Sequence, residues 1–277
     1  MQLQDKVALV TGAAHGIGRA LAKRFHAEGA RSIAVADLDG KAAQAVAEEV
    51  GGLALTVDVS REEDIRRAVA QTQESLGPID LYCSNAGVAF SDAPGWTATS
   101  QTNEQWERIW KINVMAHVWG VRAVVPGMIR RGGGYLLHTV SAAGLLNQIG
   151  DASYSTTKHA ALGFAESVAI THGDQGIKIS VLCPQAVQTR MFSTEEHSAA
   201  AEAASADGVL QPEDVAESVV RGLAEESFLI LPHPRVSEYM RRKAADYDRW
   251  LGGMRRFRRR LFPDDGMMDL GDSAEKA

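Results

Sequence analysis

Tyr154 and Lys158 are the two residues whose types and spacing most directly suggest chemistry. They are four positions apart in a proline-free run, 152–170, that is rich in helix-forming residues. If this run is a helix, the phenol and the ammonium lie on one face, a turn apart. A nearby cation lowers the pKa of a tyrosine from about 10, so the pair could exchange a proton with an alcohol or a carbonyl near neutral pH. The alternative is a half-buried tyrosine beside a solvated lysine.

A glycine-rich turn near the start of the chain suggests a phosphate site. The short apolar run 6–11 is typical of a buried parallel strand, Gly12, Gly16 and Gly18 follow it, and 19–28 has a helical pattern. In this order Gly12 allows a tight turn, Gly16 lets the backbone approach a pyrophosphate, and Gly18 lets helix and strand pack closely. The helix start then favours an anion. The spacing G-x-x-x-G-x-G differs from the common G-x-G-x-x-G, and helix–strand packing alone could also explain the glycines.

Asp37 ends the second strand-like run, 32–36, about twenty residues beyond the glycines. A carboxylate there can accept hydrogen bonds from the ribose hydroxyls of an adenosine, and it would repel a 2′-phosphate. His15 could weakly favour that phosphate when it is protonated. Because the carboxylate charge is fixed, we expect NAD to be preferred over NADP. The alternative is an ordinary turn aspartate.

Strand-like and helix-like segments alternate along the rest of the chain. This alternation predicts a single-domain α/β fold with a doubly wound parallel sheet of about seven strands and helices on both faces. Ligands of such sheets bind at the carboxyl ends of the strands. The expected strands are 6–11, 32–36, 53–57, 79–84, 134–139, 178–182 and 227–231, and the expected helices include 19–28, 41–50, 62–76, 104–131 and 152–170.

Composition narrows the class of protein. The 277 residues are 45% hydrophobic and 23% charged, which is typical of a soluble globular protein. A net charge of −6 argues against a general nucleic-acid binder, and no continuous apolar run approaches a membrane span of roughly 18 residues. Cys83 and Cys183 lie in strand-like runs and are expected to be buried free thiols. We therefore expect a cytoplasmic protein without a membrane partner or a metal site.

Several of these residues together make the sequence similar to the short-chain dehydrogenase/reductase family, of the one-domain type. The motifs occur in the family's order and at its separations, over roughly residues 5–232. They are Thr11–Gly18 with its three glycines, Asp58-Val59, Ser84-Asn85-Ala86-Gly87, Asn113, Ser141 and Tyr154-x-x-x-Lys158.

The resemblance implies a catalytic group of four residues: Asn113, Ser141, Tyr154 and Lys158. Tyr154 is implied to be the general acid/base, and Lys158 to lower its pKa and hold the nicotinamide ribose. Ser141 is implied to hydrogen-bond the substrate oxygen, as an oxyanion donor does. Asn113 is implied to hold a water relay to Lys158. An asparagine within a helix otherwise usually just faces water.

The resemblance also implies NAD(H) as the cofactor and a set of residues that contact it. They are Gly12, His15, Gly16, Ile17, Gly18, Asp37, Leu38, Asp58, Val59, Asn85, Ala86, Gly87, Tyr154, Lys158, Pro184, Val187 and Thr189. The chain departs from the family's Pro-Gly after the sixth strand, because Gln185 follows Pro184. If the glycine has a positive φ, Gln185 must either be strained or change the path of the loop.

The expected substrate pocket is mostly apolar. Its predicted walls are Trp96, Ala143, Leu145, Gln148, Gln185, Met191 and Phe192, and no pair of basic residues is expected to await an anion. By analogy, residues 192–210 form a lid over the substrate; a plain solvated helix is the alternative. We therefore expect an oxidoreductase that transfers a hydride between NAD(H) and a mainly apolar secondary alcohol or ketone. The alternatives are an NADPH-dependent 3-oxoacyl-thioester reductase and a non-catalytic dinucleotide sensor.

The C-terminal part of the chain is expected to extend the domain. Residues 235–262 look helical and contain five arginines between Arg255 and Arg260, which predict a solvated helix or a subunit contact more than a nucleic-acid or membrane site. Residues 1–262 are thus expected to form one catalytic domain, and 263–277 a loose tail. Small residues on the Tyr154 helix favour close packing with a second copy, so a homodimer or homotetramer is expected.

Overall fold

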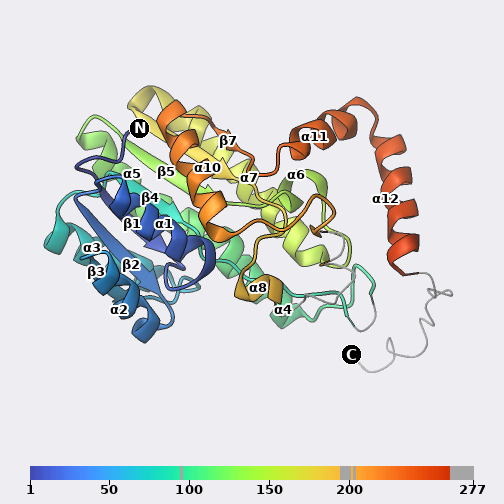
Figure 1. The fold of residues 1–277 in the computed structure, drawn as a ribbon, viewed down its shortest axis with the longest axis horizontal. Helices are drawn as coiled ribbons and strands as arrows, with labels where there is room; N and C mark the ends of the chain where they lie inside the picture. The colour runs from blue at the N-terminus through green and yellow to red at the C-terminus, as the bar shows by residue number, and fades with distance from the viewer. Residues whose placement is uncertain (94–95, 194–200, 202–203, 263–277) are drawn as a thin grey trace.

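The computed structural model describes residues 1–93, 96–193, 201 and 204–262. A sheet of seven parallel strands has the order β3-β2-β1-β4-β5-β6-β7. The fold is the expected doubly wound α/β arrangement (Figure 1). The strands are β1 Val7–Thr11, β2 Ser32–Asp37, β3 Leu53–Thr56, β4 Leu81–Ser84, β5 Gly134–Thr139, β6 Ile177–Leu182 and β7 Leu229–Ile230.

The strand order reverses between β1 and β4, because the chain winds outward from β1 in one direction and later from β4 in the other. The crevice at such a switch point is where doubly wound sheets bind ligands. The predicted glycine turn follows β1, and the predicted Asn85–Gly87 segment follows β4. Both motifs therefore lie at the edge of the sheet where a ligand is expected.

Helices cover both faces of the sheet. Apolar residues of α3, α5 and α7 pack against one face, and those of α1, α2 and α10 pack against the other. The helices are α1 Gly16–Ala27, α2 Gly40–Glu49, α3 Glu62–Leu76, α4 Asn103–Trp110, α5 Ala116–Arg130, α6 Ala143–Leu146, α7 Ala152–His172, α8 Arg190–Ser193, α10 Pro212–Glu225, α11 Arg235–Ala245 and α12 Tyr247–Leu261, with a 3-10 turn η2 Gly173–Gln175.

The expected helix 104–131 is interrupted by a π-helical turn, η1 Lys111–Met115, between α4 and α5. Asn113 lies in this turn, and π-turns inside helices are frequent at functional sites. By length and composition alone, the helical segment Asn103–Arg130 is apolar enough to cross a membrane. This was not expected from the sequence, where no continuous apolar run of that length was found. However, 56% of its most apolar window is buried, so this segment packs into the core of the described structure.

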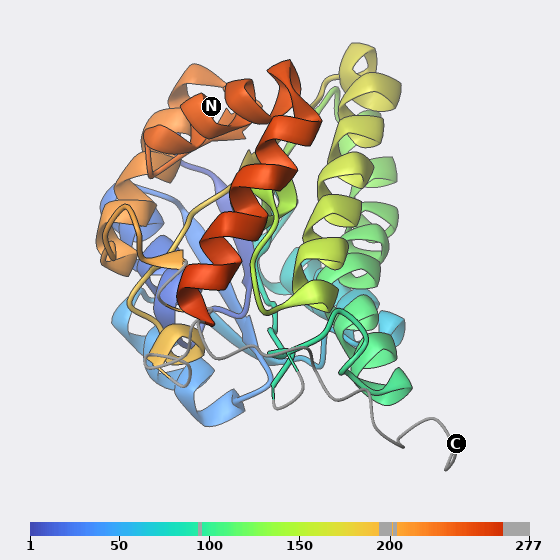
Figure 2. The same cartoon turned by 90° about the vertical axis from the view of Figure 1, so that its right-hand side faces the viewer.

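The expected C-terminal helix is instead two helices. Asp246 adopts an extended conformation between α11 and α12, and its carboxylate accepts a hydrogen bond from the Arg249 N–H at the start of α12 (2.9 Å). An aspartate is a favourable residue for such a cap. Figure 1 shows the consequence: α12 turns away from α11 and stands to one side of the rest of the domain, and Figure 2 gives the view turned by 90°. Residues 263–277 lie outside the described residues.

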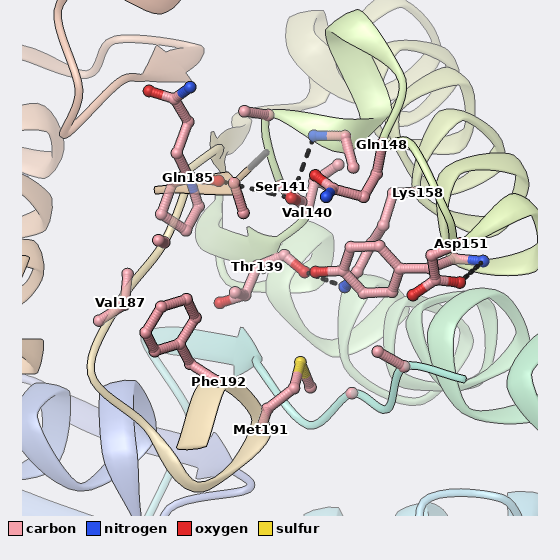
Figure 3. A pocket seen from close by; sticks show the side chains of 18 of the residues that line it. Thr139, Val140, Ser141, Gln148, Asp151, Lys158, Gln185, Val187, Met191 and Phe192 are labelled. Atoms are coloured by element: carbon pink, nitrogen blue, oxygen red, sulfur yellow. Dashed lines mark hydrogen bonds between the residues drawn. The ribbon is translucent and has the colours of Figure 1, made fainter. Parts of the chain in front are cut away.

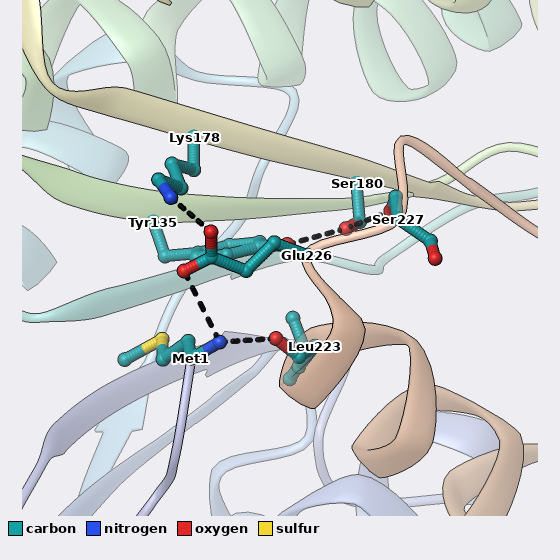
Figure 4. Close-up of polar contacts among 7 residues, drawn as sticks. All are labelled: Met1, Tyr135, Lys178, Ser180, Leu223, Glu226 and Ser227. Atoms are coloured by element: carbon teal, nitrogen blue, oxygen red, sulfur yellow. Dashed lines mark hydrogen bonds and ion pairs between the residues drawn. The ribbon is translucent and has the colours of Figure 1, made fainter.

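A polar cluster ties the first residue to the last part of the sheet, as Figure 4 shows. Glu226 accepts from the Met1 ammonium and from Lys178 on β6. Next to it, the Tyr135 and Ser180 hydroxyls are 2.8 Å apart, and Ser180 donates to the Ser227 carbonyl at 2.6 Å. This cluster joins β5, β6 and the end of α10. Cys83 and Cys183 are buried free thiols, as expected.

Candidate active site

Helix α7 places Tyr154 in its first turn and Lys158 one turn later. The helix begins there because the buried Asp151 carboxylate accepts a hydrogen bond from the Tyr154 N–H (3.0 Å). The Lys158 Nζ lies 5.4 Å from the centre of the Tyr154 ring. Tyr154 is half-buried, but only 2% of Lys158 is exposed, so the alternative of a solvated lysine is wrong.

The Lys158 ammonium is held in place from the opposite side. Its Nζ donates to the Thr139 carbonyl at the end of β5 (3.0 Å), as Figure 3 shows. Burial lowers the pKa of Lys158 to about 8, because the charged form loses water around it. The group therefore stays cationic at neutral pH but can gain or lose a proton in the weakly alkaline range.

Ser141 follows β5 and faces the same space. Its Oγ accepts from the Ala143 N–H (3.1 Å) and lies 3.4 Å from the Pro184 carbonyl, which is also bonded by the Ala142 N–H. Ser141 is 8% exposed and lines one cavity together with Tyr154 and Lys158. Three of the four predicted catalytic residues thus surround the same cavity.

Asn113 is fully buried beside that cavity and does not line it. Its side-chain amide pairs with both backbone groups of Val88, accepting from the N–H (3.0 Å) and donating to the carbonyl (2.9 Å). Its Nδ2 also lies 3.2 Å from the Thr157 hydroxyl on α7. The alternative, an asparagine that simply faces water, is therefore wrong here. A Cβ added to Gly87 would lie 3.3 Å from Asn113 Oδ1 and 3.4 Å from Lys158 Nζ, so Gly87 separates the two groups.

The glycine turn is packed too tightly for side chains. Gly12 has a φ of +63°, and a Cβ on it would lie 2.8 Å from the Ala86 Cα. A Cβ on Gly18 would lie 2.1 Å from the Gly12 carbonyl oxygen, which is far inside contact distance. Asn85 Nδ2 donates to the carbonyls of Thr11 and Gly12 (3.0 and 3.2 Å). The turn after β1 and the end of β4 therefore form one rigid unit.

Asp37 lies at the carboxyl end of β2 and is half-buried. Each of its carboxylate oxygens accepts one backbone N–H, from Ala14 (2.9 Å) and from Asp39 (3.0 Å). A carboxylate oxygen has more than one acceptor position, so the group retains capacity for ligand hydroxyls. On the neighbouring turn, His15 lies 3.7 Å from the Asp39 carboxylate and 2.7 Å from Arg190.

Most of the site residues predicted from the sequence line one large cavity. It measures about 880 Å³ and lies along the carboxyl edge of the sheet. All of the predicted cofactor residues line it except Gly18, which packs against the Gly12 carbonyl where α1 meets the turn after β1. The members are Gly12, His15, Gly16, Ile17, Asp37, Leu38, Asp58, Val59, Asn85, Ala86, Gly87, Tyr154, Lys158, Pro184, Val187 and Thr189.

Two of the seven predicted pocket residues do not line the cavity. Ala143, Gln148, Gln185, Met191 and Phe192 line the cavity, but Trp96 and Leu145 do not. Leu145 is buried in the core, and its neighbour Leu146 lines the cavity instead, because one residue along a helical turn changes direction by about 100°. The Trp96 ring packs on Phe262 after α12, with ring centres 4.9 Å apart.

Gln185 causes no backbone strain. It is absent from the described non-glycine residues with positive φ, and its N–H donates to the buried His233 Nδ1 (3.2 Å). The loop after β6 therefore follows a path that a glutamine adopts readily. The expected lid, 192–210, lies partly outside the described residues; of the described part, Ala201, Ala204, Ala206 and Asp207 line the cavity with Phe192.

Sequence reasoning missed one whole wall of the cavity. One face of α11 and one face of α12 line it, together with Arg108 from α4. These residues recur at helical spacing, and this spacing is visible in the sequence. It was interpreted there as a sign of a solvated helix or a subunit contact. They are Arg235, Tyr239, Arg242, Trp250, Gly253, Met254, Phe257 and Arg260.

Two histidines form a buried pair beside Lys158. His117 on α5 and His138 on β5 are 1% and 0% exposed, with ring centres 4.5 Å apart. Within the described structure none of their ring nitrogens has a hydrogen-bond partner. Burial lowers the pKa of His138 to about 3, and burial next to His138 and Lys158 lowers the pKa of His117 well below its ordinary value. Both rings are therefore neutral in the folded protein at neutral pH.

We expect this pair to make folding stability depend on pH. Below a pH of about 6.5, which is the ordinary pKa of histidine, these two side chains are protonated in the unfolded chain but stay neutral in the folded protein. Each histidine therefore lowers the free energy of unfolding by about 1.4 kcal/mol per pH unit. The loss begins as the pH falls below that value and continues down to the folded-state pKa. Urea unfolding at several pH values measures it. His138→Phe should make the dependence shallower, whereas His26→Gln, at an exposed site, should not; equal slopes in all three proteins would contradict the expectation.

Comparison with known proteins identifies the family. Residues 6–200 match the family model described as short chain dehydrogenase. The chain is 35% identical over 237 residues to a 1-deoxy-11-beta-hydroxypentalenate dehydrogenase of Streptomyces exfoliatus, covering 83% of this chain and 84% of that one. It is 35% identical over 195 residues to a 2-(R)-hydroxypropyl-CoM dehydrogenase of Xanthobacter autotrophicus, covering 68% and 76%.

A solved structure is similar over nearly the whole fold. A short chain dehydrogenase/reductase from Burkholderia phymatum in complex with NAD superposes with a TM-score of 0.80 at 25% identity, covering 90% of this chain and 96% of that one. The seven-stranded parallel sheet with helices on both faces agrees with this likeness. The chain therefore belongs to the short-chain dehydrogenase/reductase family and is an oxidoreductase that acts on CH–OH and C=O groups.

Proposed function

We propose that this protein transfers a hydride between NAD(H) and a mainly apolar secondary alcohol or ketone. One observation carries the proposal: Ser141, Tyr154 and Lys158 meet on the wall of a cavity that is also lined by the glycine turn and by Asp37. A proton-transfer group and a dinucleotide-sized site thus share one space. The relatives that are named for oxidation of a hydroxypentalenate and a hydroxypropyl compound support the same reaction class.

In this proposal Tyr154 exchanges a proton with the substrate oxygen. The Lys158 ammonium, 5.4 Å from the Tyr154 ring, stabilises the phenolate that forms when the tyrosine gives up its proton. The Ser141 hydroxyl donates to the same substrate oxygen and stabilises developing alkoxide charge. Asn113 and Thr139 keep their neighbours in position through the bonds to Val88 and to Lys158. The bound nicotinamide supplies or accepts the hydride.

The residues at the cofactor end fit a dinucleotide. The Gly16 backbone at the start of α1 lines the cavity beside the Thr189 side chain, and a helix start favours a pyrophosphate. Leu38 is 68% exposed at the cavity edge, where an exposed apolar side chain suits the face of an adenine. Asp37 retains acceptor capacity for ribose hydroxyls. These features support NAD(H) over its 2′-phosphorylated form, because that phosphate would lie beside the Asp37 carboxylate.

Titration with NADH and NADPH, followed by nicotinamide fluorescence, tests this proposal. We expect NADH to bind at least tenfold more tightly, since a phosphate beside Asp37 meets like charge. Asp37→Asn keeps the shape of the side chain and should narrow the preference. Asp174→Asn is the charge-matched control, because Asp174 is exposed and does not line the cavity. A wild-type preference for NADPH would refute the ribose role of Asp37 and favour the 3-oxoacyl-thioester reductase alternative.

We also propose that the protein is a homodimer or homotetramer. Ile170 on α7 is 84% exposed and Trp110 at the end of α4 is 41% exposed, which is unusual for such large apolar side chains. Helix α4 packs against α7, and small residues of α7 permit close approach of a second copy. Light scattering at micromolar concentration measures the mass. A monomer would contradict the proposal.

A further inference from the structure

The helices α11 and α12, which we call the C-terminal hairpin, present one continuous face to the cavity. On α11 the lining residues Arg235, Tyr239 and Arg242 are spaced i, i+4 and i+7. On α12 the lining residues are Trp250, Gly253, Met254, Phe257 and Arg260, again on one side of the helix. Apolar side chains make up most of this face. Arginines lie at its two ends, Arg235 and Arg260, and near the joint, Arg242.

The hairpin is held at its joint and at its far end. Near the joint, Lys243 donates to the Leu145 carbonyl of α6 at 2.7 Å. At the far end, the Phe262 ring packs on Trp96, and Arg258 donates to the Trp96 carbonyl at 3.2 Å. Between these points no described residue of α12 is buried. The middle of α12 therefore faces the open cavity with Trp250, Met254 and Phe257, which are all only partly buried.

The charges on the cavity wall are unbalanced. Arg235 pairs with Asp207, which also accepts from the Tyr239 hydroxyl (3.0 Å), and Arg242 pairs with Glu238 on its own helix. Three further arginines of the wall, Arg108, Arg190 and Arg260, have no carboxylate partner among the described residues, and Arg190 lies at the cofactor end, 2.7 Å from His15.

Arg108 and Arg260 each stack on an aromatic ring. The Arg108 guanidinium lies over the ring of Phe90 (5.9 Å), in the connector between β4 and α4, and the Arg260 guanidinium lies over the ring of Phe257 on its own helix (5.3 Å). Two guanidiniums thus line the same cavity as the apolar face of the C-terminal hairpin. Guanidinium groups are well suited to carboxylates and other oxyanions.

We infer that the substrate is an amphipathic acid, with its apolar body against Tyr239, Trp250, Met254 and Phe257 and its acid group paired with Arg108 and Arg260. The inference rests on the proposed function, because it names the substrate class of the same site. It departs from the expectation that no pair of basic residues awaits an anion. The matching alcohol carries its reacting hydroxyl at one end, near Tyr154, and its oxyanion at the other.

Kinetics with a matched pair of probes tests the inference. The probes are (ω−1)-hydroxydodecanoate and its methyl ester, which share the secondary alcohol and the chain but differ in the anionic end. We expect kcat/KM to be about tenfold higher for the acid, and the preference to shrink at high salt because the arginines are exposed. Arg260→Gln and Arg108→Gln should each raise KM for the acid about fivefold with little change in kcat.

Arg259→Gln is the matched control. Arg259 belongs to the same basic run of the same helix and is exposed, but it does not line the cavity, so its variant should keep the wild-type preference for the acid. Equal kcat/KM for acid and ester, or an equal loss in the Arg259 variant, would overturn the inference while leaving the proposed function intact.

A binding measurement separates the two proposals. Calorimetric titration with dodecanoate, and with dodecylamine as the opposite charge, needs no turnover. We expect dodecanoate to bind more tightly, with the difference lost in the Arg108→Gln, Arg260→Gln double variant. Such binding without nicotinamide-dependent turnover of any alcohol would support the anion site and refute the proposed function. Turnover without any advantage for dodecanoate would refute the anion site alone.

Discussion

Replacing Tyr154 by phenylalanine is expected to lower kcat by about 10²- to 10⁴-fold, the range that a positioned general acid/base contributes. The change removes only the phenolic oxygen and keeps the ring beside Lys158. The Asp151 cap at the start of α7 bonds the Tyr154 backbone N–H, so the helix start is also retained. Stability and NADH affinity should therefore change little. Steady-state kinetics, thermal unfolding and NADH fluorescence titration measure the three effects.

Tyr247→Phe is the matched control for this experiment. Tyr247 begins α12, is 57% exposed and does not line the cavity, so loss of its hydroxyl should leave kcat at the wild-type value. A Tyr154→Phe enzyme that keeps full turnover would remove Tyr154 from the mechanism. The same result would revive the non-catalytic sensor, which needs the dinucleotide but not the phenol.

Replacing Gly18 by alanine should disrupt both the fold and cofactor binding. A Cβ at this position would lie 2.1 Å from the Gly12 carbonyl oxygen and 2.6 Å from Asn85 Nδ2. Backbone cannot yield as a flexible side chain does, so α1 must move away from the turn after β1. Overpacking of this kind typically costs about 1–3 kcal/mol, more than alanine gains in helix propensity. We expect a lower melting temperature and loss of NADH binding, because the displaced turn is the expected pyrophosphate site.

Gly173→Ala supplies the contrasting substitution. Gly173 ends α7 with ordinary helical angles, a φ of −56° and a ψ of −48°, and a Cβ on it would meet nothing within 4 Å. Alanine should stabilise the protein there by about 0.4–1 kcal/mol, since it restricts the unfolded chain. If both variants melt at the wild-type temperature, the close contact at Gly18 is not a constraint on the fold.

The placement of Asn113 shows where local pattern and tertiary structure disagree. By local pattern alone, an asparagine within a long helical segment is unfavourable and usually faces water, and only the family resemblance implied a buried functional role for Asn113. In the fold, the π-turn directs its amide toward Val88 and Thr157, so its hydrogen-bonding capacity is satisfied inside the protein. The unfavourable helix propensity of Asn113 is compensated by hydrogen bonds to Val88 and Thr157, which are 25 and 44 residues away along the chain. No window of sequence contains those partners.

The seven strands, their order along the chain and the position of the glycine turn were predictable from sequence. Each depends on neighbouring residues: a short apolar run makes a buried strand, glycines allow the turn, and helical periodicity marks the helix that follows. The Tyr154–Lys158 pair was predictable for the same reason, because a four-residue spacing within one helix fixes their common face. These features need no knowledge of the rest of the chain.

Only the tertiary structure decided which side chains meet across the cavity. It placed Leu146 rather than Leu145 on the wall, packed Trp96 on Phe262, and turned the apolar face of α12 with Arg260 toward the site. Sequence periodicity shows that a helix has an apolar face, but the partner of that face depends on the direction in which the chain turns at Asp246 and on contacts with residues more than a hundred positions away. The reaction could therefore be inferred from local motifs and the family resemblance that they carry together, whereas the cavity wall formed by α11 and α12 arises from long-range packing.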